Sequence, residues 1–191
     1  MLKFIFSEQF LISTILFATP ILFAAFAALI SKKAGILNIN VEGTMSLSAL
    51  AGGLVSFATK SWVVGLLTAL LVGVIMNFVF AAFSMKLKTD KILSGIALNT
   101  LASGLSIYLL YVVIGVKGDS SLNPSVLIPD INIPLLSKIP IIGKAIFGQN
   151  LLVYIAIIAV FFVMFLLNRT KLGVHIKAVG YNEDAAKSVG I

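Results

Sequence analysis

The 191-residue sequence contains no cysteine and a single histidine. Disulfide bonds, cysteine-ligated metals and thiol catalysis are therefore excluded, although the absence of cysteine says nothing about cellular compartment. The histidine, His175, lies in a basic stretch near the C-terminus. We interpret it as an ordinary interfacial residue. No catalytic residue and no metal site is predicted for this chain.

Charged residues are also scarce. They make up 11% of the chain, against 60% hydrophobic residues and a mean hydropathy of +1.12. A soluble domain has about a quarter charged residues and about half apolar ones. The polar surface is too small to cover the chain in water, so the composition indicates an integral membrane protein. The net charge of +7 does not indicate nucleic-acid binding, because the basic residues sit at the ends of apolar runs and form no patch with interleaved aromatics.

Five apolar runs predict the fold class, an all-α, polytopic transmembrane helix bundle. Crossing the roughly 30 Å hydrocarbon core takes about 20 helical residues. The predicted membrane segments are residues 10–30, 45–59, 62–83, 92–116 and 151–167. They form a single transmembrane domain over residues 1–191, with a loop at 117–150 and a tail at 168–191. The first run is longer than the apolar core of a signal peptide and is followed by basic residues, so we expect a retained span.

The second run, 45–59, is short and rich in glycine, alanine and serine. Small residues let helix backbones approach closely in lipid. Short, glycine-interrupted segments also occur where transporters break a helix beside a cavity. Both interpretations stay open at this point, and so does the question of whether this run spans the membrane completely.

The distribution of lysine and arginine predicts the orientation. If all five segments cross, nine of the 14 basic residues share one side: Lys32, Lys33, Lys86, Lys88, Lys91, Arg169, Lys171, Lys177 and Lys187. The other five are Lys3, Lys60, Lys117, Lys138 and Lys144. By the positive-inside rule the larger set is cytoplasmic. The N-terminus is then outside the cell membrane and the C-terminal tail is cytoplasmic.

The outside loop, 117–150, carries Pro124, Pro129, Pro134 and Pro140 among apolar stretches. These prolines forbid a continuous spanning helix. We expect short interfacial or re-entrant pieces that pack against the outer face of the bundle.

The five runs contain no Asp, Glu, Lys, Arg or His. Proton-driven transporters need ionisable groups at membrane depth, so this absence argues against that class. The nucleotide-binding pattern G-x-x-x-x-G-K-[ST] is missing as well, because Gly143-Lys144 is followed by Ala145. If ATP drives transport here, another chain must hydrolyse it.

Neutral polar residues in or beside the runs, together with one acid, are candidates for a translocation path. A polar side chain in lipid needs a partner, so it faces either a neighbouring helix or a water-filled cavity. A neutral cavity would suit an uncharged, hydroxyl-rich solute. An acid ahead of a helix can also be no more than a cap. The candidates are Asn38, Asn40, Glu42, Asn77, Ser94 and Asn99.

The tail predicts a short helix after Asn182, which is a good N-cap residue. Glu183 and Asp184 fall in its first turn, and Gly190 ends it. A helix of two turns is marginal in water. It therefore needs a packing partner, in this chain or in another.

Three stretches carry a family likeness: KKAGILNINVEGTM (32–45), KTDKILSGIALNTLASGLSIYLL (88–110) and TKLGVHIKAVGYNEDAAKSVGI (170–191). The sequence resembles permease subunits of ATP-binding-cassette (ABC) importers of the branched-chain amino acid and ribose class. The loop IPLLSKIPIIGKAIFG (133–148) makes the nucleoside and simple-sugar permeases the closest subfamily.

The resemblance implies a permease subunit that translocates nucleosides or simple sugars and pairs with a second permease, homo- or heterodimeric. An ABC ATPase would bind the ATP, so no cofactor is expected in this chain, and an extracytoplasmic solute-binding protein would deliver the substrate. It also implies that this chain lacks the C-terminal third of the family domain. An ATP-independent channel or facilitator, or a structural subunit of a membrane complex, is the alternative. The residues implied to couple to the ATPase are Asn182, Glu183, Asp184, Ala185, Ala186 and Gly190.

Overall fold

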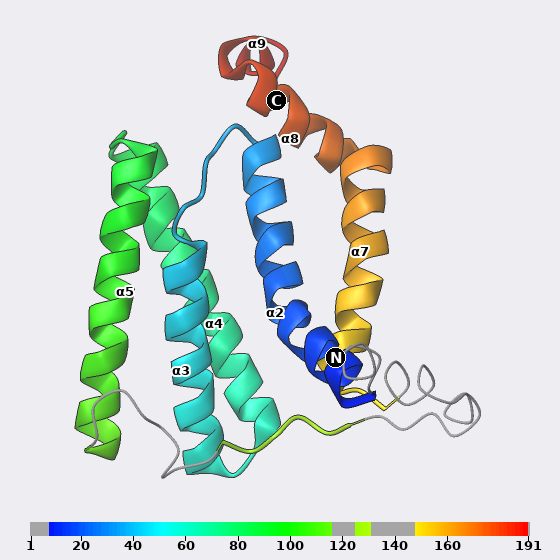
Figure 1. The fold of residues 1–191 in the computed structure, drawn as a ribbon. Coiled ribbons are helices and arrows are strands. Elements are labelled where there is room, and N and C mark those ends of the chain that lie inside the picture. Colours follow the sequence, from blue (N-terminus) through cyan, green and yellow to red (C-terminus); the bar gives the residue numbers. More distant parts are fainter. Residues whose placement is uncertain (1–7, 116–124, 131–147, 191) are drawn as a thin grey trace. The chain divides into compact units, whose positions relative to one another are not determined.

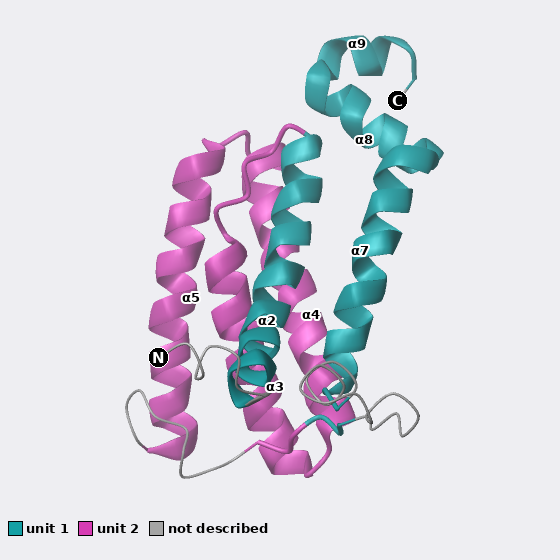
Figure 2. Cartoon of the chain, turned by 45° about the vertical axis from the view of Figure 1, so that its right-hand side comes forward, with its two compact units in different colours: residues 1–34, 128–191 teal, residues 35–127 magenta. Residues whose placement is uncertain are grey.

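The computed structural model describes residues 8–115, 125–130 and 148–190, and the regular elements in those ranges are helices (Figure 1). In chain order they are α2 (Glu8–Lys33), α3 (Val41–Thr59), α4 (Trp62–Ala81), the π-helical turn η1 (Ala82–Lys86), α5 (Lys91–Ile114), α7 (Leu151–Arg169), α8 (Lys171–Tyr181) and α9 (Glu183–Ser188). The predicted all-α class is confirmed. The chain divides into two compact units: residues 1–34 with 128–191 form unit 1, and residues 35–127 form unit 2 (Figure 2).

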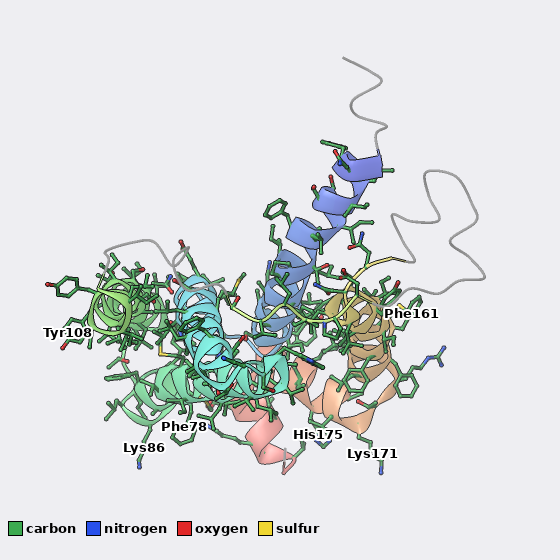
Figure 3. All side chains as sticks on the ribbon, turned by 90° about the horizontal axis from the view of Figure 1, so that it is seen from below. Phe78, Lys86, Tyr108, Phe161, Lys171 and His175 are labelled. Carbon is green, nitrogen blue, oxygen red and sulfur yellow. The ribbon has the colours of Figure 1, made fainter. Side chains whose placement is uncertain are left out.

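Five helices are long and apolar enough to cross a membrane, as predicted. They cover Gln9–Lys33, Val41–Thr59, Trp62–Lys86, Lys91–Ile114 and Leu151–Arg169. Large apolar and aromatic side chains project outward from them: Phe78 of α4, Tyr108 of α5 and Phe161 of α7 are 74%, 61% and 63% exposed (Figure 3). A soluble protein rarely exposes such continuous apolar surface. These helices form a multi-pass membrane protein.

Side chains at the helix starts explain where two of the spans begin. The Asp90 carboxylate accepts hydrogen bonds from the backbone N–H groups of Ile92 and Leu93 at 2.9 and 2.8 Å. Asn150 caps α7 in the same way, through the N–H of Leu152 at 3.0 Å. Each cap satisfies N–H groups that have no partner within their own helix.

In unit 2, α3 packs against both α4 and α5, whereas α4 and α5 have little contact with each other. Leu47 of α3, Met76 of α4 and Ala102 of α5 form the buried core where the three helices meet. The contact between α3 and α4 is the most extensive in the described part of the chain.

Glycines explain how closely α3 and α4 approach. A Cβ on Gly65 would lie 2.5 Å from the Cβ of Ser56 and 2.7 Å from the carbonyl oxygen of Gly52. A Cβ on Gly52 would lie 2.9 Å from that of Ala69. In lipid no hydrophobic force drives helices together, so their association depends on van der Waals packing. Small residues at the interface allow the two backbones to approach closely enough for that packing. We call this contact the glycine seam.

The glycine seam decides between the two interpretations of the second apolar run. Close packing is confirmed, and the broken-helix alternative is wrong, because α3 is one continuous helix of 19 residues. It begins four residues before the predicted start, at Val41 instead of Met45. At 1.5 Å per residue it is about 28 Å long, close to the thickness of the hydrocarbon core.

In unit 1, α2 packs against α7 and α8. The chain turns sharply between α7 and α8 at Thr170, whose Oγ1 donates to the Leu166 carbonyl at 2.6 Å and accepts from the Gly173 N–H at 3.1 Å. A Cβ on Gly173 would collide with the carbonyl oxygen of Leu166 and lie 2.7 Å from the Cα of Leu167. Only glycine fits this turn.

Most of the loop predicted to pack on the outer face, 117–150, lies outside the described residues. Its described parts are attached to nearby helices. The Val126 N–H donates to Ser56 Oγ of α3 at 2.9 Å, within unit 2. The Leu151 N–H donates to the Pro129 carbonyl at 3.4 Å, within unit 1.

Candidate functional site

Two regions contain the predicted functional residues: a polar cluster around the start of α3, in unit 2, and the C-terminal helices, in unit 1. Within the polar cluster, Asn40 immediately precedes α3 and is fully buried. Its Nδ2 donates to Thr44 Oγ1 at 3.1 Å, and its backbone N–H donates to Asn38 Oδ1 at 3.0 Å. The Oδ1 atom of Asn40 is buried and has no hydrogen-bond partner among the described residues.

Asn99 connects α5 to this turn. Its Oδ1 accepts from the Gly43 N–H at 2.8 Å, and its Nδ2 donates to the Ile39 carbonyl at 2.9 Å. A Cβ on Gly43 would lie 2.7 Å from Asn99 Oδ1, so glycine is required for the amide to reach the backbone. Gly95, one turn earlier on α5, is similarly constrained, because its Cβ would lie 3.0 Å from that of Ile39. The Asn99 amide thus fastens the first turn of α3 to α5.

Asn77 adds α4 to the same cluster. Its Oδ1 accepts from Asn38 Nδ2 at 3.2 Å, and its own Nδ2 donates to the Gly73 carbonyl at 2.9 Å. Four asparagines from three parts of unit 2 therefore hydrogen-bond around one turn: Asn38, Asn40, Asn77 and Asn99. These bonds support the interpretation of the polar residues as connections between helices.

Glu42 and Ser94, the other two candidates for the path, are not bonded into this cluster. Ser94 is engaged at the start of α5, where its Oγ donates to the Asp90 carbonyl at 2.8 Å and lies 2.7 Å from Thr89 Oγ1. Glu42 is exposed in the first turn of α3, where the helix dipole stabilises an acid. Its carboxylate forms no hydrogen bond or ion pair with the described residues.

The chemistry of the cluster is that of neutral amides, which donate and accept hydrogen bonds without carrying charge. Such groups suit contacts with hydroxyl-rich or amide-bearing molecules. Within residues 8–115, 125–130 and 148–190, no three His, Asp or Glu side chains gather as metal ligands would.

The C-terminal helix α9 has the predicted caps. Asn182 Oδ1 accepts from the Ala185 N–H at 3.0 Å. Gly190, just past the helix, has φ +80°, in the left-handed region that glycine adopts readily. The predicted helix is confirmed at Glu183–Ser188.

The packing partner that this helix needs is α8 of the same chain. Ala186 is 4% exposed and therefore packs within the chain, so its side chain is not free to meet another protein. Asp184 and Ala185 are exposed. Of the two alanines assigned to coupling, only Ala185 lies on an accessible face.

Glu183 forms an ion pair within its own helix. The Lys187 Nζ atom donates to Glu183 Oε1 at 2.7 Å, and both side chains are 65% exposed. This hydrogen bond, together with the charge of Glu183, raises the pKa of Lys187 above its ordinary value of 10.5. Any contact of Glu183 with a basic group of the ATPase, to which the resemblance couples this residue, would therefore compete with Lys187.

Sequence reasoning missed the helix α8. In this tail a single short helix was predicted, after Asn182, whereas Lys171–Tyr181 is also helical and includes Gly173 and Gly180. The signal that could have revealed it is Thr170, a good N-cap residue three positions before Gly173.

The chain matches a family model described as "Branched-chain amino acid transport system / permease component" over residues 10–191. Its relatives include the nucleoside ABC transporter permease protein NupC of Lactococcus lactis subsp. cremoris, 31% identical over 93% of this chain and 57% of the relative. The putative glucose ABC transporter permease protein TsgC13 of Haloferax volcanii is 31% identical over 97% of this chain and 56% of the relative. The guanosine ABC transporter permease protein NupQ of Bacillus subtilis is 29% identical over 94% and 58%.

The chain spans a little over half the length of these curated relatives. No solved structure matches it. The family match covers all five apolar helices, the polar cluster and the described C-terminal helices. The chain belongs to the permease component family of branched-chain amino acid transport systems.

Proposed function

We propose that the chain is a permease subunit of an ABC importer that translocates nucleosides or simple sugars across the cytoplasmic membrane. The observation that carries this proposal is the family match together with relatives named as nucleoside, guanosine and glucose permeases. The absence of charged residues from the predicted membrane runs supports it, because an uncharged solute needs no counter-ion at membrane depth.

The ATP is hydrolysed by a separate ATPase subunit in this proposal. The sequence lacks a phosphate-binding loop of the G-x-x-x-x-G-K-[ST] type, which supports the assignment of ATP hydrolysis to a separate subunit. The helix α9 is the coupling helix, and its exposed residues Asp184 and Ala185 contact the ATPase. Asn182 and Gly190 contribute by defining the ends of that helix, and Ala186 by attaching it to α8. A second permease subunit and an extracytoplasmic solute-binding protein complete the importer.

The asparagine cluster lies beside the translocation path in this proposal. Its one buried acceptor without a partner, Asn40 Oδ1, supports a second arrangement in which that atom gains a hydrogen bond. A cluster that exchanges partners between two states would let α3 move relative to α5 during transport. Glu42 and Ser94 remain candidates for the path on their sequence positions alone.

The proposed orientation places the N-terminus outside and α9 in the cytoplasm. Because the sequence contains no cysteine, single cysteines report accessibility without background. A membrane-impermeant maleimide applied to intact cells should label Asp130→Cys and leave Ala185→Cys unlabelled. Labelling of Ala185→Cys, with Asp130→Cys protected until the cells are permeabilised, would reverse the orientation.

Contact with the ATPase is tested with the same Ala185→Cys variant. We expect a short bifunctional reagent to crosslink it to a co-expressed single-cysteine variant of the partner ATPase, and we expect Asp130→Cys to give no crosslink. Equal crosslinking of the two variants would contradict the assignment of α9.

Transport itself is tested by uptake of radiolabelled nucleosides and sugars in cells that express the whole importer. Ala185→Trp should abolish ATP-dependent uptake, because a large side chain on the exposed face keeps α9 from seating. Ala185→Ser, which stays small, is the matched control and should retain uptake. Unchanged uptake with Ala185→Trp would contradict the proposal that α9 couples this chain to the ATPase. Binding of nucleosides and sugars to the cognate binding protein decides between the two substrate classes.

A further inference from the structure

A basic pocket of about 280 Å³ lies within unit 1, between the end of α2 and the second half of α8. Both helices belong to the same compact unit (Figure 2). The residues that line the pocket are Leu29, Lys32, Lys33, Lys177, Gly180 and Tyr181. Three of these six carry a positive charge and none carries a negative one.

The three lysines have no carboxylate partner among the described residues, where the recorded ion pair is that of Lys187 with Glu183. Lys177 Nζ donates to Asn168 Oδ1 at 2.9 Å, a neutral partner that leaves the charge of the lysine uncompensated. Lys32 and Lys33 are exposed, and their side chains form no hydrogen bond with the residues that the structure describes. Three like charges around one pocket repel each other, and an anion placed among them would be stabilised by all three.

The surroundings favour a lipid over a free anion. Lys32 and Lys33 form the last turn of α2, directly after its apolar span, at the depth where lipid phosphates lie. Leu29 supplies an apolar wall and is 40% exposed. Apart from Thr19, the side chains described for α2 are at least partly exposed, and Phe17 and Ile21 are largely so, which leaves an apolar surface open to acyl chains. Tyr181 places an aromatic ring with a hydroxyl at the rim, as is common at membrane interfaces.

We propose that this pocket binds the phosphate headgroup of an anionic phospholipid, with the acyl chains lying along the apolar surface of α2. Basic pockets at the end of transmembrane helices recognise anionic headgroups through charge and hydrogen bonds to phosphate oxygens. The lipid neutralises the three lysines and connects α8 to the membrane. Since α8 carries α9, the bound lipid holds the C-terminal helix at a defined distance from the membrane surface.

Native mass spectrometry of the full chain in a non-ionic detergent tests the proposal. Phosphatidylglycerol and phosphatidylcholine with the same acyl chains are titrated in separate arms, and phosphatidylglycerol should bind more tightly. In the triple variant Lys32→Gln, Lys33→Gln, Lys177→Gln, its affinity should fall by about fivefold for each lysine removed. The control variant Lys86→Gln, Lys88→Gln, Lys171→Gln loses the same charge at residues that do not line the pocket and should change affinity by less than about twofold.

Equal loss in the two triple variants would overturn the pocket and leave only a general attraction of the basic chain for anionic lipid. Equal binding of the two lipids would overturn the requirement for negative charge. Displacement of the lipid by millimolar inorganic phosphate would reassign the pocket to a free anion. If the triple variant does not fold, the double variant Lys32→Gln, Lys33→Gln serves, because these two side chains form no hydrogen bond within the described part of the chain. The measurement needs neither ATPase nor transport, so its outcome is independent of the proposed function.

Discussion

Unit 2 and the C-terminal helix α9 are held in place by different kinds of contact. In unit 2 the decisive contacts join residues far apart in the sequence, such as Gly43 with Asn99 and Gly52 with Gly65. In α9 the hydrogen bonds and the ion pair that the structure records span four residues or fewer, from the cap at Asn182 to the pair of Glu183 with Lys187. A few tertiary contacts therefore fix how the helices of unit 2 meet, whereas the ends of α9 are defined by its own sequence and α8 supplies its packing.

This difference suits a permease. A bundle that works inside lipid has little hydrophobic force to hold its helices together and depends on close packing and interhelical hydrogen bonds. In the proposed function α9 meets an ATPase, and such a helix must stay exposed and keep its shape before binding. Mutations at the contacts of unit 2 should therefore lower the stability of the whole unit. Mutations in α9 should disturb only the local order of that helix.

The largest effect is expected at the glycine seam. Gly65→Val places branched carbon atoms where a single Cβ would already lie 2.5 Å from Ser56. The two helices must separate, which should cost about 2 to 3 kcal/mol and lower the melting temperature in detergent. Gly104→Val is the matched control, because a Cβ on Gly104 would meet nothing within 4 Å. The melting temperatures of the two variants are measured by fluorescence-detected size exclusion. Equal values would contradict the role of the glycine seam in holding α3 against α4.

The next effect is expected at the amide that joins α5 to α3. Asn99→Leu removes two interhelical hydrogen bonds and leaves the Gly43 N–H without its partner, which should cost about 1 to 2 kcal/mol. Thr100→Val is the control, because Thr100 Oγ1 bonds only to the Ile96 carbonyl of its own helix. Chemical denaturation in mixed micelles compares the two. If Asn99→Leu leaves stability intact and abolishes uptake, the residue acts in the path and not as a connection between helices.

In α9 the cap should matter locally and not globally. Asn182→Ala removes the acceptor of the Ala185 N–H, which costs about 1 kcal/mol at a helix start. Hydrogen exchange should accelerate in residues 183–188, with the melting temperature of the bundle unchanged. Asn182→Asp keeps a side-chain oxygen for the cap and should exchange like the parent chain. A fall in melting temperature with Asn182→Ala would show that α9 supports the bundle and that the effect of its cap is not only local.

The same difference explains which features the sequence could predict. The ends of α9 were predicted from Asn182 and Gly190, because caps act within a few residues. The five apolar helices were predicted from length and hydropathy. The pairing of Gly43 with Asn99 could not be predicted, since nothing local identifies a partner 56 residues away. The helix α8 was missed because it contains Gly173, and glycine is a poor helix former that is required here by the backbone of α7 passing beside it.

The smallest effect is expected at the exposed pair of Glu183 and Lys187. The pKa of Lys187 is raised in the folded helix above the 10.5 of the unfolded chain. The stabilisation from this pair is therefore fully present below pH 10.5 and is lost as the pH rises through the folded-state pKa. With ¹³C-labelled lysine, the Lys187 Cε resonance should titrate with a midpoint above 10.5, and Glu183→Gln should bring the midpoint back toward 10.5.

Because both side chains of the Glu183–Lys187 pair are mostly exposed and screened by solvent, Lys187→Met should accelerate hydrogen exchange in α9 less than Asn182→Ala does. A larger effect of Lys187→Met would mean that the pair, and not the cap, defines the helix.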